Sequence, residues 1–228
     1  MASLKKIPAS GVKGILAHND RQEGFFSHKD IDASRSHLNQ PVLVRACSPY
    51  DYYWARRQEP HCLHRADVKP LCSWVATAPA DLPMEAQRLF FKETYAFIAQ
   101  RYGEKNMVQA VVHCDEAGQP HMHVCFIPAI GDAKHGGEKI CANDVITRKD
   151  LVTFHGDWQQ WLDEHGVHAV VKNGITKAQG GNRTVDQLKY ERDHTHTVTR
   201  EVSHDRWSTP THQYTHSYEF DDTKGGHW

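Results

Sequence analysis

Long hydrophobic runs are absent from this sequence. No apolar stretch reaches the roughly 18 residues that a membrane-spanning helix needs. Residues 1–17 also lack the continuous apolar stretch of a secretory signal peptide. These absences argue against a membrane protein and against a secreted one, so we expect a cytoplasmic protein with no membrane span.

Closely spaced cysteine pairs are absent as well. The six cysteines show no Cys-x-x-Cys spacing, and several of them lie in apolar runs typical of strands. In such surroundings reduced, buried thiols are expected rather than disulfides.

The chain lacks the basic excess that usually marks a nucleic-acid-binding protein. Its 27 Lys and Arg are balanced by 28 Asp and Glu, which gives a formal net charge of −1. The distribution is uneven: residues 1–70 hold 11 basic against 7 acidic side chains, a difference of +4, and the remainder holds 16 against 21, a difference of −5. The positive charge of the chain is therefore concentrated in its first part.

The last part of the chain lacks a core-forming pattern. From about residue 176 the composition turns to Gly, Thr, His and charged residues, and 193–228 has no helical or strand period. Within this part, Thr184–Arg192 has the pattern of a short helix. We therefore expect a folded domain over residues 1–175 and a polar, His-rich extension over 176–228 that is partly helical and partly disordered.

Strand and helix patterns alternate through residues 1–175. Strands are predicted over 4–8, 41–45, 71–77, 108–113, 121–127 and 168–172, and helices over 11–21, 83–102 and 147–165. The last two helices have apolar faces, formed by Phe91, Tyr95, Ile98 and Tyr102 and by Leu151, Phe154, Trp158, Trp161 and Leu162. Segment 47–69 shows no clear period, and 129–142 reads as a Gly-containing loop. The pattern predicts an α+β fold of ferredoxin-like type, with an antiparallel sheet backed by helices.

Three histidines surround one short turn. His113 ends a β-branched strand pattern, and His121 and His123 open the next one. Side chains two apart on a strand share a face, and pairing of the two strands brings His113 beside the other two. Three neutral imidazoles suit Zn, Mn, Fe, Co or Ni and leave coordination positions open, so we expect a catalytic divalent metal site. Glu116, in the turn, can orient a ligand histidine, act as a base or bind the metal itself.

These residues resemble a known motif. The stretch HCDEAGQPHMHVCFIP, from His113 to Pro128, is similar to the signature of the Mob/Pre (MobV) family of plasmid mobilisation relaxases, which are HUH endonucleases. A second block, AHNDRQEGFFSHKDIDASRSHLN over residues 17–39, resembles the N-terminal segment of that family. Weaker similarity extends the match to about residues 3–175. The turn before His121 is one residue longer than usual, and Gln40 stands where the family tends to have Tyr.

The resemblance implies a function and roles for further residues. It implies an enzyme that nicks one strand of single-stranded or hairpin DNA at an origin of transfer, for mobilisation or plasmid recombination, with one Mn or Mg ion. His18 would be the nucleophile that forms a phosphoramidate with the 5′ end, and Arg21 would stabilise the reacting phosphate. Candidate DNA contacts are Arg35, Asn39, Gln40 and Tyr102. A coupling protein or a second copy of the chain is a further expected partner.

Two other functions stay open. A rolling-circle replication initiator would attack with a tyrosine, and Tyr50, Tyr52 and Tyr53 are the candidates. Initiators usually place that tyrosine after the histidine motif, whereas relaxases place their nucleophile before it. A non-catalytic DNA-binding remnant is the other alternative, favoured by the weak basicity. Metal-dependent cleavage of a single-stranded oligonucleotide separates these functions.

Overall fold

The computed structural model describes residues 1–22, 24, 31–63, 65, 67–116, 118–134 and 136–171, and the backbone of residues 196–199 and 215–218. The chain forms two compact units, Met1–Gly174 and Ile175–Trp228. In the second unit, β8 (His196–Thr199) and β9 (Thr215–Tyr218) pair in antiparallel fashion, although the sequence predicted no strand there. The helix predicted over Thr184–Arg192 lies outside the described residues. None of the described helices is long and apolar enough to cross a membrane.

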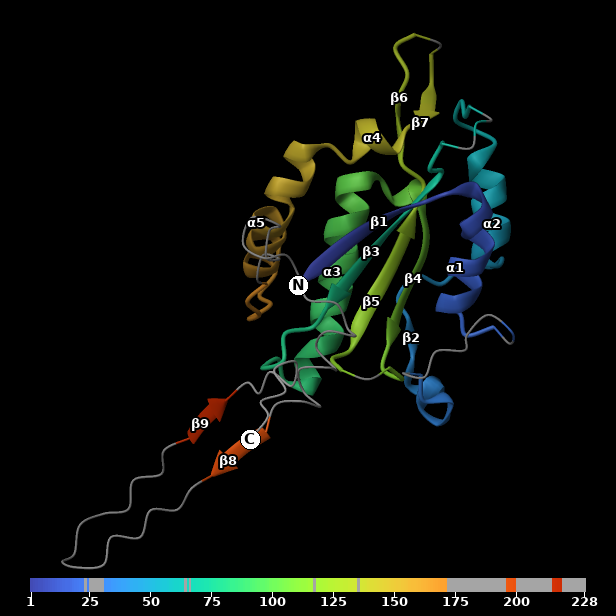
Figure 1. The fold of residues 1–228 in the computed structure, drawn as a ribbon. Coiled ribbons are helices and arrows are strands. Elements are labelled where there is room, and N and C mark those ends of the chain that lie inside the picture. Colours follow the sequence, from blue (N-terminus) through green and yellow to red (C-terminus); the bar gives the residue numbers. More distant parts are fainter. Residues whose placement is uncertain are drawn as a thin grey trace, which may run out of the picture. The chain divides into compact units, whose positions relative to one another are not determined.

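The first unit is built on a five-stranded antiparallel sheet with the strand order β1-β3-β5-β4-β2 (Figure 1). Its strands are β1 (Ala2–Ile7), β2 (Gln40–Pro41), β3 (Leu71–Thr77), β4 (Met107–His113) and β5 (His121–Phe126). Strands β4 and β5 form the predicted hairpin, and β3 pairs with β5 on its other side. The histidine hairpin therefore lies in the interior of the sheet, where neighbouring strands fix its position.

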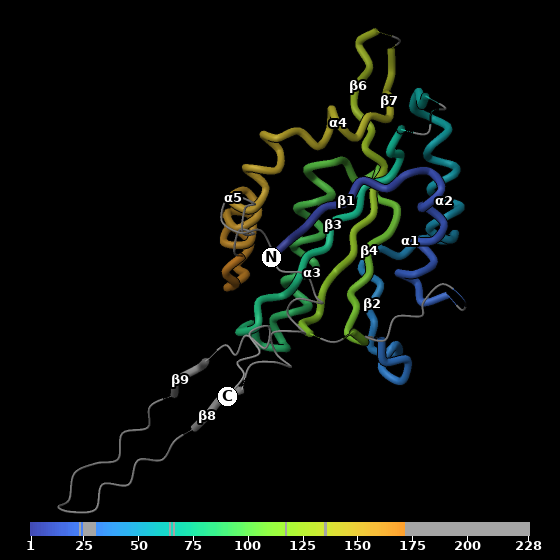
Figure 2. Tube along the Cα trace, viewed as in Figure 1, coloured from blue at the N-terminus to red at the C-terminus, as the bar shows by residue number. Residues whose placement is uncertain are grey.

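Helices cover both faces of this sheet (Figures 1 and 2). On one face lie α3 (Met84–Tyr102) and α5 (Arg148–Glu164), and on the other lie α1 (Val12–Asn19) and α2 (Pro49–Arg57). Strand alternation separates the two cores, since Met122, Val124 and Phe126 pack with α3 and α5 while Cys125 and Ile127 pack with α1 and α2. His121 and His123 alternate with the first set, so they face the α1 side.

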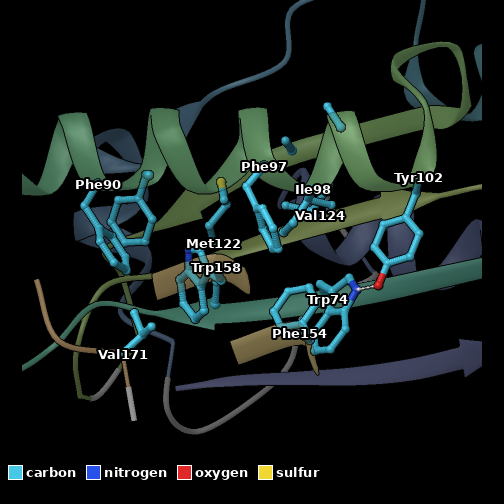
Figure 3. Close-up of a cluster of buried hydrophobic side chains, with 14 of the residues drawn as sticks. Trp74, Phe90, Phe97, Ile98, Tyr102, Met122, Val124, Phe154, Trp158 and Val171 are labelled. Carbon is cyan, nitrogen blue, oxygen red and sulfur yellow. Dashed lines mark hydrogen bonds between the residues drawn. The ribbon is translucent and has the colours of Figure 1, made fainter. Parts of the chain in front are cut away.

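The core between the sheet and α3 and α5 is rich in aromatic rings (Figure 3). Trp74 stacks on Phe154 with ring centroids 3.8 Å apart, and its Nε1 donates a hydrogen bond to the Tyr102 hydroxyl. Of the apolar stripe predicted for α5, Phe154, Trp158 and Leu162 are fully buried, but Leu151 is 46% exposed. The helical period was therefore right for its central positions and wrong for the first turn.

Replacing the two leucines of α5 should give very different results. We expect Leu162→Ala to lower the free energy of unfolding by about 2–5 kcal/mol, because it leaves a cavity in the core. Leu151→Ala, on the same helix, should change it by less than about 0.5 kcal/mol. Urea denaturation followed by circular dichroism measures both, and equal losses would contradict the assigned orientation of α5.

Three local predictions were wrong. The strand predicted over 41–45 ends at Pro41, because Val42 and Leu43 both donate to the Ala110 carbonyl and break the ladder. Segment 129–142 contains the hairpin of β6 (Ala129–Gly131) and β7 (Glu138–Ile140), and it continues into α4 (Ala142–Val145). Residues 168–171 form no strand, since the Gln159 side chain pairs with the backbone of Ala169 and Val171.

Helix α2 was not predicted from the sequence. Ser48 caps its N-terminus by accepting a hydrogen bond from the Asp51 backbone, and Pro49 occupies the first turn. Its buried side includes Arg56, which is 3% exposed and donates to Asn106, Glu59 and Glu138. A buried arginine interrupts the apolar period, so the helix gives no amphipathic signal.

Candidate metal centre and nucleophile

The three histidines converge as the strand pattern predicted. His113 lies directly opposite His121 in the β4–β5 register, and His123 follows two residues later on the same face. The centroids of the three rings are 4.7 to 5.6 Å apart. Together with Glu116 they offer four candidate ligand atoms that all lie within 4.8 Å of one another. This is the spacing at which side chains can share one cation.

Backbone carbonyls orient two of the rings. Nε2 of His113 lies 2.8 Å from the carbonyl oxygen of Asn19, at the end of α1, and must carry the proton to donate there. Nδ1 of His121 lies 3.3 Å from the Gln119 carbonyl in the same way. The opposite nitrogens, Nδ1 of His113 and Nε2 of His121, then present their lone pairs to the cluster. Outer contacts of this kind commonly fix the tautomer of metal-binding histidines.

The inner nitrogens lack partners in a way that fits a metal. Nδ1 of His113 and both ring nitrogens of His123 are buried without a hydrogen bond among the described residues. Burial lowers the pKa of His121 and lowers that of His123 well below its usual value, so both rings are neutral at pH 7. Buried polar atoms rarely remain unpaired. Neutral imidazoles with free lone pairs are ready ligands for a divalent ion.

Glu116 links the histidines to the N-terminal segment. Its carboxylate oxygens lie 3.5 Å from Nδ1 of His113 and 3.5 Å from Nε2 of His121, and Oε1 accepts a hydrogen bond from Arg21 at 2.7 Å. The interaction with His113 and the bond from Arg21 outweigh burial and hold the pKa of Glu116 well below its usual range. A base works best with a pKa near the working pH. The geometry therefore favours Glu116 as an orienting group or a ligand over the base that the sequence left open.

Arg21 joins the cluster to His18. It follows the end of α1 in a left-handed conformation with φ of 53°, so it reaches inward although it lies beyond the helix on which it was predicted. Its guanidinium donates two bonds to Asp115, at 2.7 and 2.8 Å, and one to Glu116. Its Nη1 lies 3.4 Å from Nε2 of half-buried His18. His18 and Arg21 therefore lie beside the cluster of histidines and Glu116.

Asp115 is a residue of this site that sequence reasoning did not single out. Its carboxylate is fully buried and accepts hydrogen bonds from Arg21, from Ser36 at 2.7 Å and from Asn39 at 2.8 Å. It thereby ties Arg21 to the short helix Ala33–Leu38. The sequence feature that could have identified Asp115 is its position beside Glu116 in a short polar turn. A carboxylate in such a turn is buried only if cations and amides surround it.

The predicted DNA contacts fall into three situations. Arg35 and Gln40 are exposed, beside the site, and available to a ligand. Asn39 uses its amide internally, because Nδ2 donates to Asp115 and Oδ1 accepts from the Cys114 backbone. The prediction that Tyr102 stacks on a DNA base is wrong. Tyr102 is 6% exposed, stacks on Phe126 and donates to Asp150 on the far face of the sheet.

Two of the three candidate tyrosine nucleophiles, Tyr52 and Tyr53, are not placed to attack at the histidines. Tyr52 donates to the carbonyl of Lys105, just before β4 begins, whereas His113 ends β4. Seven strand residues separate these points by roughly 20 Å. Tyr53 is 2% exposed, and burial raises its pKa to about 12. Neither arrangement provides a tyrosine nucleophile at the histidines.

Neutralising Asp115 should reduce stability in a pH-dependent way. Burial opposes its ionisation, but the bonds from Arg21, Ser36 and Asn39 outweigh it and hold the pKa of Asp115 well below the usual range. The carboxylate therefore stabilises the fold above the unfolded pKa of about 3.9, and this stabilisation is lost as pH falls from there towards the folded pKa. We expect Asp115→Asn to cost about 3 kcal/mol at pH 7 and progressively less below pH of about 4.

Urea denaturation at several pH values measures this difference. The exposed Asp81 gives a control, since Asp81→Asn should leave stability nearly unchanged at each pH. A cost for Asp115→Asn that stayed constant down to pH of about 2 would mean that the ionised carboxylate contributes nothing.

Comparison with known proteins relates this site to a family. The sequence profile described as plasmid recombination enzyme (Mob_Pre) matches residues 1–192. A plasmid recombination enzyme of Bacillus thuringiensis is 33% identical over 169 residues, which are 72% of this chain and 37% of that protein. Another, of Streptococcus agalactiae, is 29% identical over 200 residues, 83% of this chain and 38% of that protein. The chain thus spans well under half the length of these curated relatives.

Solved structures agree with the sequence comparison. The MobM relaxase domain (MOBV; Mob_Pre), in a Mn-bound crystal structure with plasmid pMV158 oriT DNA at pH 6.8, is 28% identical with a TM-score of 0.67. The match covers 83% of this chain and 97% of that domain. A Mn-bound structure of the same domain at pH 4.6 gives 27% identity and a TM-score of 0.67, covering 83% and 98%. The predicted α+β relaxase fold is confirmed.

Proposed function

Because the chain belongs to the plasmid recombination enzyme family, we propose that it is a relaxase domain that nicks one DNA strand at an origin of transfer. One observation carries this proposal. The Arg21 guanidinium contacts both His18 and Glu116. Glu116 in turn belongs to the cluster of candidate ligands with His113, His121 and His123. A cation site and a candidate nucleophile thus lie together, as transesterification at a phosphate requires.

The metal in this proposal is a divalent ion, with Mn or Mg as the candidates. The structurally similar relaxase domain is Mn-bound, and the unpaired nitrogens here fit such an ion. His113, His121 and His123 would hold it, and Glu116 would orient them or complete the set. When bound, the ion supplies positive charge that polarises the scissile phosphate and offsets its developing charge.

The chain's own residues supply the nucleophile and a second cation. A ring nitrogen of His18 attacks phosphorus, and a neutral imidazole needs no strong base for this, since the reference pKa of histidine is about 6.5. An N–P bond forms, and the bond from phosphorus to the 3′ oxygen breaks. The departing oxygen gains one proton and the phosphorylated imidazole loses one, so protons balance. Arg21, fixed by Asp115, donates to the phosphate oxygens.

The DNA substrate approaches the α1 face of the sheet. Arg35 and Gln40 are exposed on the segment that Asp115 anchors beside Arg21. The related relaxase domain binds oriT DNA, which supports an origin of transfer as the substrate. Mobilisation or plasmid recombination is the process that such nicking serves.

A denaturing gel tests the proposal. Single-stranded oligonucleotides that tile the DNA beside the coding gene are incubated with the protein and Mn²⁺. We expect one of them to be cut into two products, one of which stays bound to the protein in SDS, and we expect EDTA to abolish cutting. Tight binding of that oligonucleotide without any cutting would instead favour the non-catalytic remnant.

A further inference from the structure

Helix α2 carries an aromatic surface that the nicking site does not use. Trp54 is 42% exposed on its outer side, and Tyr50, one turn earlier, is half-buried. The two rings pack edge to face with centroids 6.2 Å apart, and Trp54 also packs edge to face on buried Tyr53 at 5.9 Å. These contacts hold the indole in one orientation while part of it meets solvent. Single exposed apolar residues are common, but a supported indole is a ready stacking platform.

Arg57 adds positive charge to this surface. Its guanidinium lies 5.2 Å from the centroid of Trp54. In the part of the chain that the structure describes, Arg57 forms no salt bridge, and its Nε is buried without a hydrogen bond. Neighbouring Arg56, by contrast, is neutralised by Glu59 and Glu138. The α2 surface, defined as Tyr50, Trp54 and Arg57, which share one face of the helix, therefore keeps uncompensated charge beside its rings.

The α2 surface lies on the same side of the sheet as the candidate nucleophile. Helices α1 and α2 pack together over one hydrophobic cluster that includes Leu16 and Tyr53. Tyr52 of α2 contacts Lys105 before the start of β4, and His113 ends that strand, which puts helix α2 on the order of 20 Å from the histidines. At about 3.4 Å per stacked nucleotide this is on the order of six nucleotides. One DNA strand can reach both sites.

We propose that the α2 surface binds single-stranded DNA that flanks the nick, with a base stacked on Trp54 and a phosphate held by Arg57. Planar aromatic rings beside an uncompensated cation match the chemistry of a single strand, whose bases and phosphates are both accessible. This inference rests on the proposed function for its ligand, but it concerns binding and not cutting.

Binding of a fluorescein-labelled dT24 oligonucleotide in EDTA, followed by fluorescence anisotropy, tests the inference without any nicking. Trp54→Ala should weaken binding about 5- to 150-fold, because one stacked base is worth about 1–3 kcal/mol. Trp54→Phe should keep most of the affinity. Arg57→Gln should lower the slope of log affinity against log salt concentration by about 0.7, the value for one phosphate contact on a single strand.

Leu89→Ala is the matched control, since Leu89 is an apolar residue that is also 42% exposed but lies on α3, across the sheet. It should bind dT24 like the parent. Trp54→Ala binding within twofold of the parent would overturn the inference, whether or not nicking is found. Equal weakening of a 24-base-pair duplex would overturn it in favour of double-stranded DNA, and a matching loss in Leu89→Ala would show a general effect on the fold.

Discussion

Replacing His18 by Ala should abolish the covalent protein–DNA complex and reduce nicking by at least about 10⁴-fold, a size typical of removing a nucleophile. Two of the candidate tyrosines are not placed to replace it, because Tyr53 is buried and Tyr52 lies roughly 20 Å from the histidines. His18 is half-buried and lies outside the group of candidate ligands. Metal affinity and binding of an uncut oligonucleotide should therefore stay within a few-fold of the parent.

The chemistry of the adduct provides an independent check. A phosphoramidate on histidine is labile in acid, whereas a phosphate ester on tyrosine survives. SDS gels before and after acid treatment, followed by peptide mapping, identify the linked residue. Tyr52→Phe and Tyr53→Phe serve as controls and should form as much complex as the parent. An acid-stable adduct that persists in His18→Ala would show that a tyrosine is the nucleophile and would favour the replication initiator.

Replacing His121 by Ala should have the second large effect, on metal binding. A site with three imidazoles has little redundancy, so we expect Mn²⁺ affinity to fall by more than about 100-fold. His121 is a suitable choice because its side chain is 14% exposed, so its loss disturbs the core less than loss of fully buried His113. Isothermal titration calorimetry measures the affinity directly. Thermal unfolding provides a second reading, since Mn²⁺ at 100 times its Kd should stabilise the parent by about 2.7 kcal/mol.

Two further variants make this result specific. His123→Ala should lose Mn²⁺ binding as well, because both of its ring nitrogens are buried without partners. His168→Ala removes an exposed histidine outside the cluster and should bind Mn²⁺ like the parent. Parental affinity in both His121→Ala and His123→Ala would show that the ion binds elsewhere.

The sequence predicted the parts of the site that depend on local rules. Strand alternation and a short turn determine how His113, His121 and His123 converge, and both can be read along the chain. Asp115 could not be assigned in this way, since its role arises from Arg21 and Ser36, which lie 94 and 79 residues away. Neither the burial of Asp115 nor its contacts with these distant partners produces a periodic pattern in the sequence.

The same limit explains the errors about aromatic residues. Tyr102 shares an apolar helical face with Ile98, and the sequence shows this face without showing which side of the sheet it covers. The tyrosines and Trp54 of α2 looked like an unordered cluster because buried Arg56 breaks their helical period. In both cases tertiary packing, which a single sequence does not display, decides which ring meets solvent.

The hydrogen bond from His113 to the carbonyl of Asn19 makes the site depend on chain length as well as on side-chain identity. A backbone carbonyl is present whatever residue occupies position 19, so substitution there leaves this acceptor in place. Inserting or deleting one residue in α1 is different, because it turns the helix end by about 100° and shifts it by about 1.5 Å. Such a change would displace this acceptor together with His18 and Arg21, so variation in α1 should be found as exchanged residues and not as altered length.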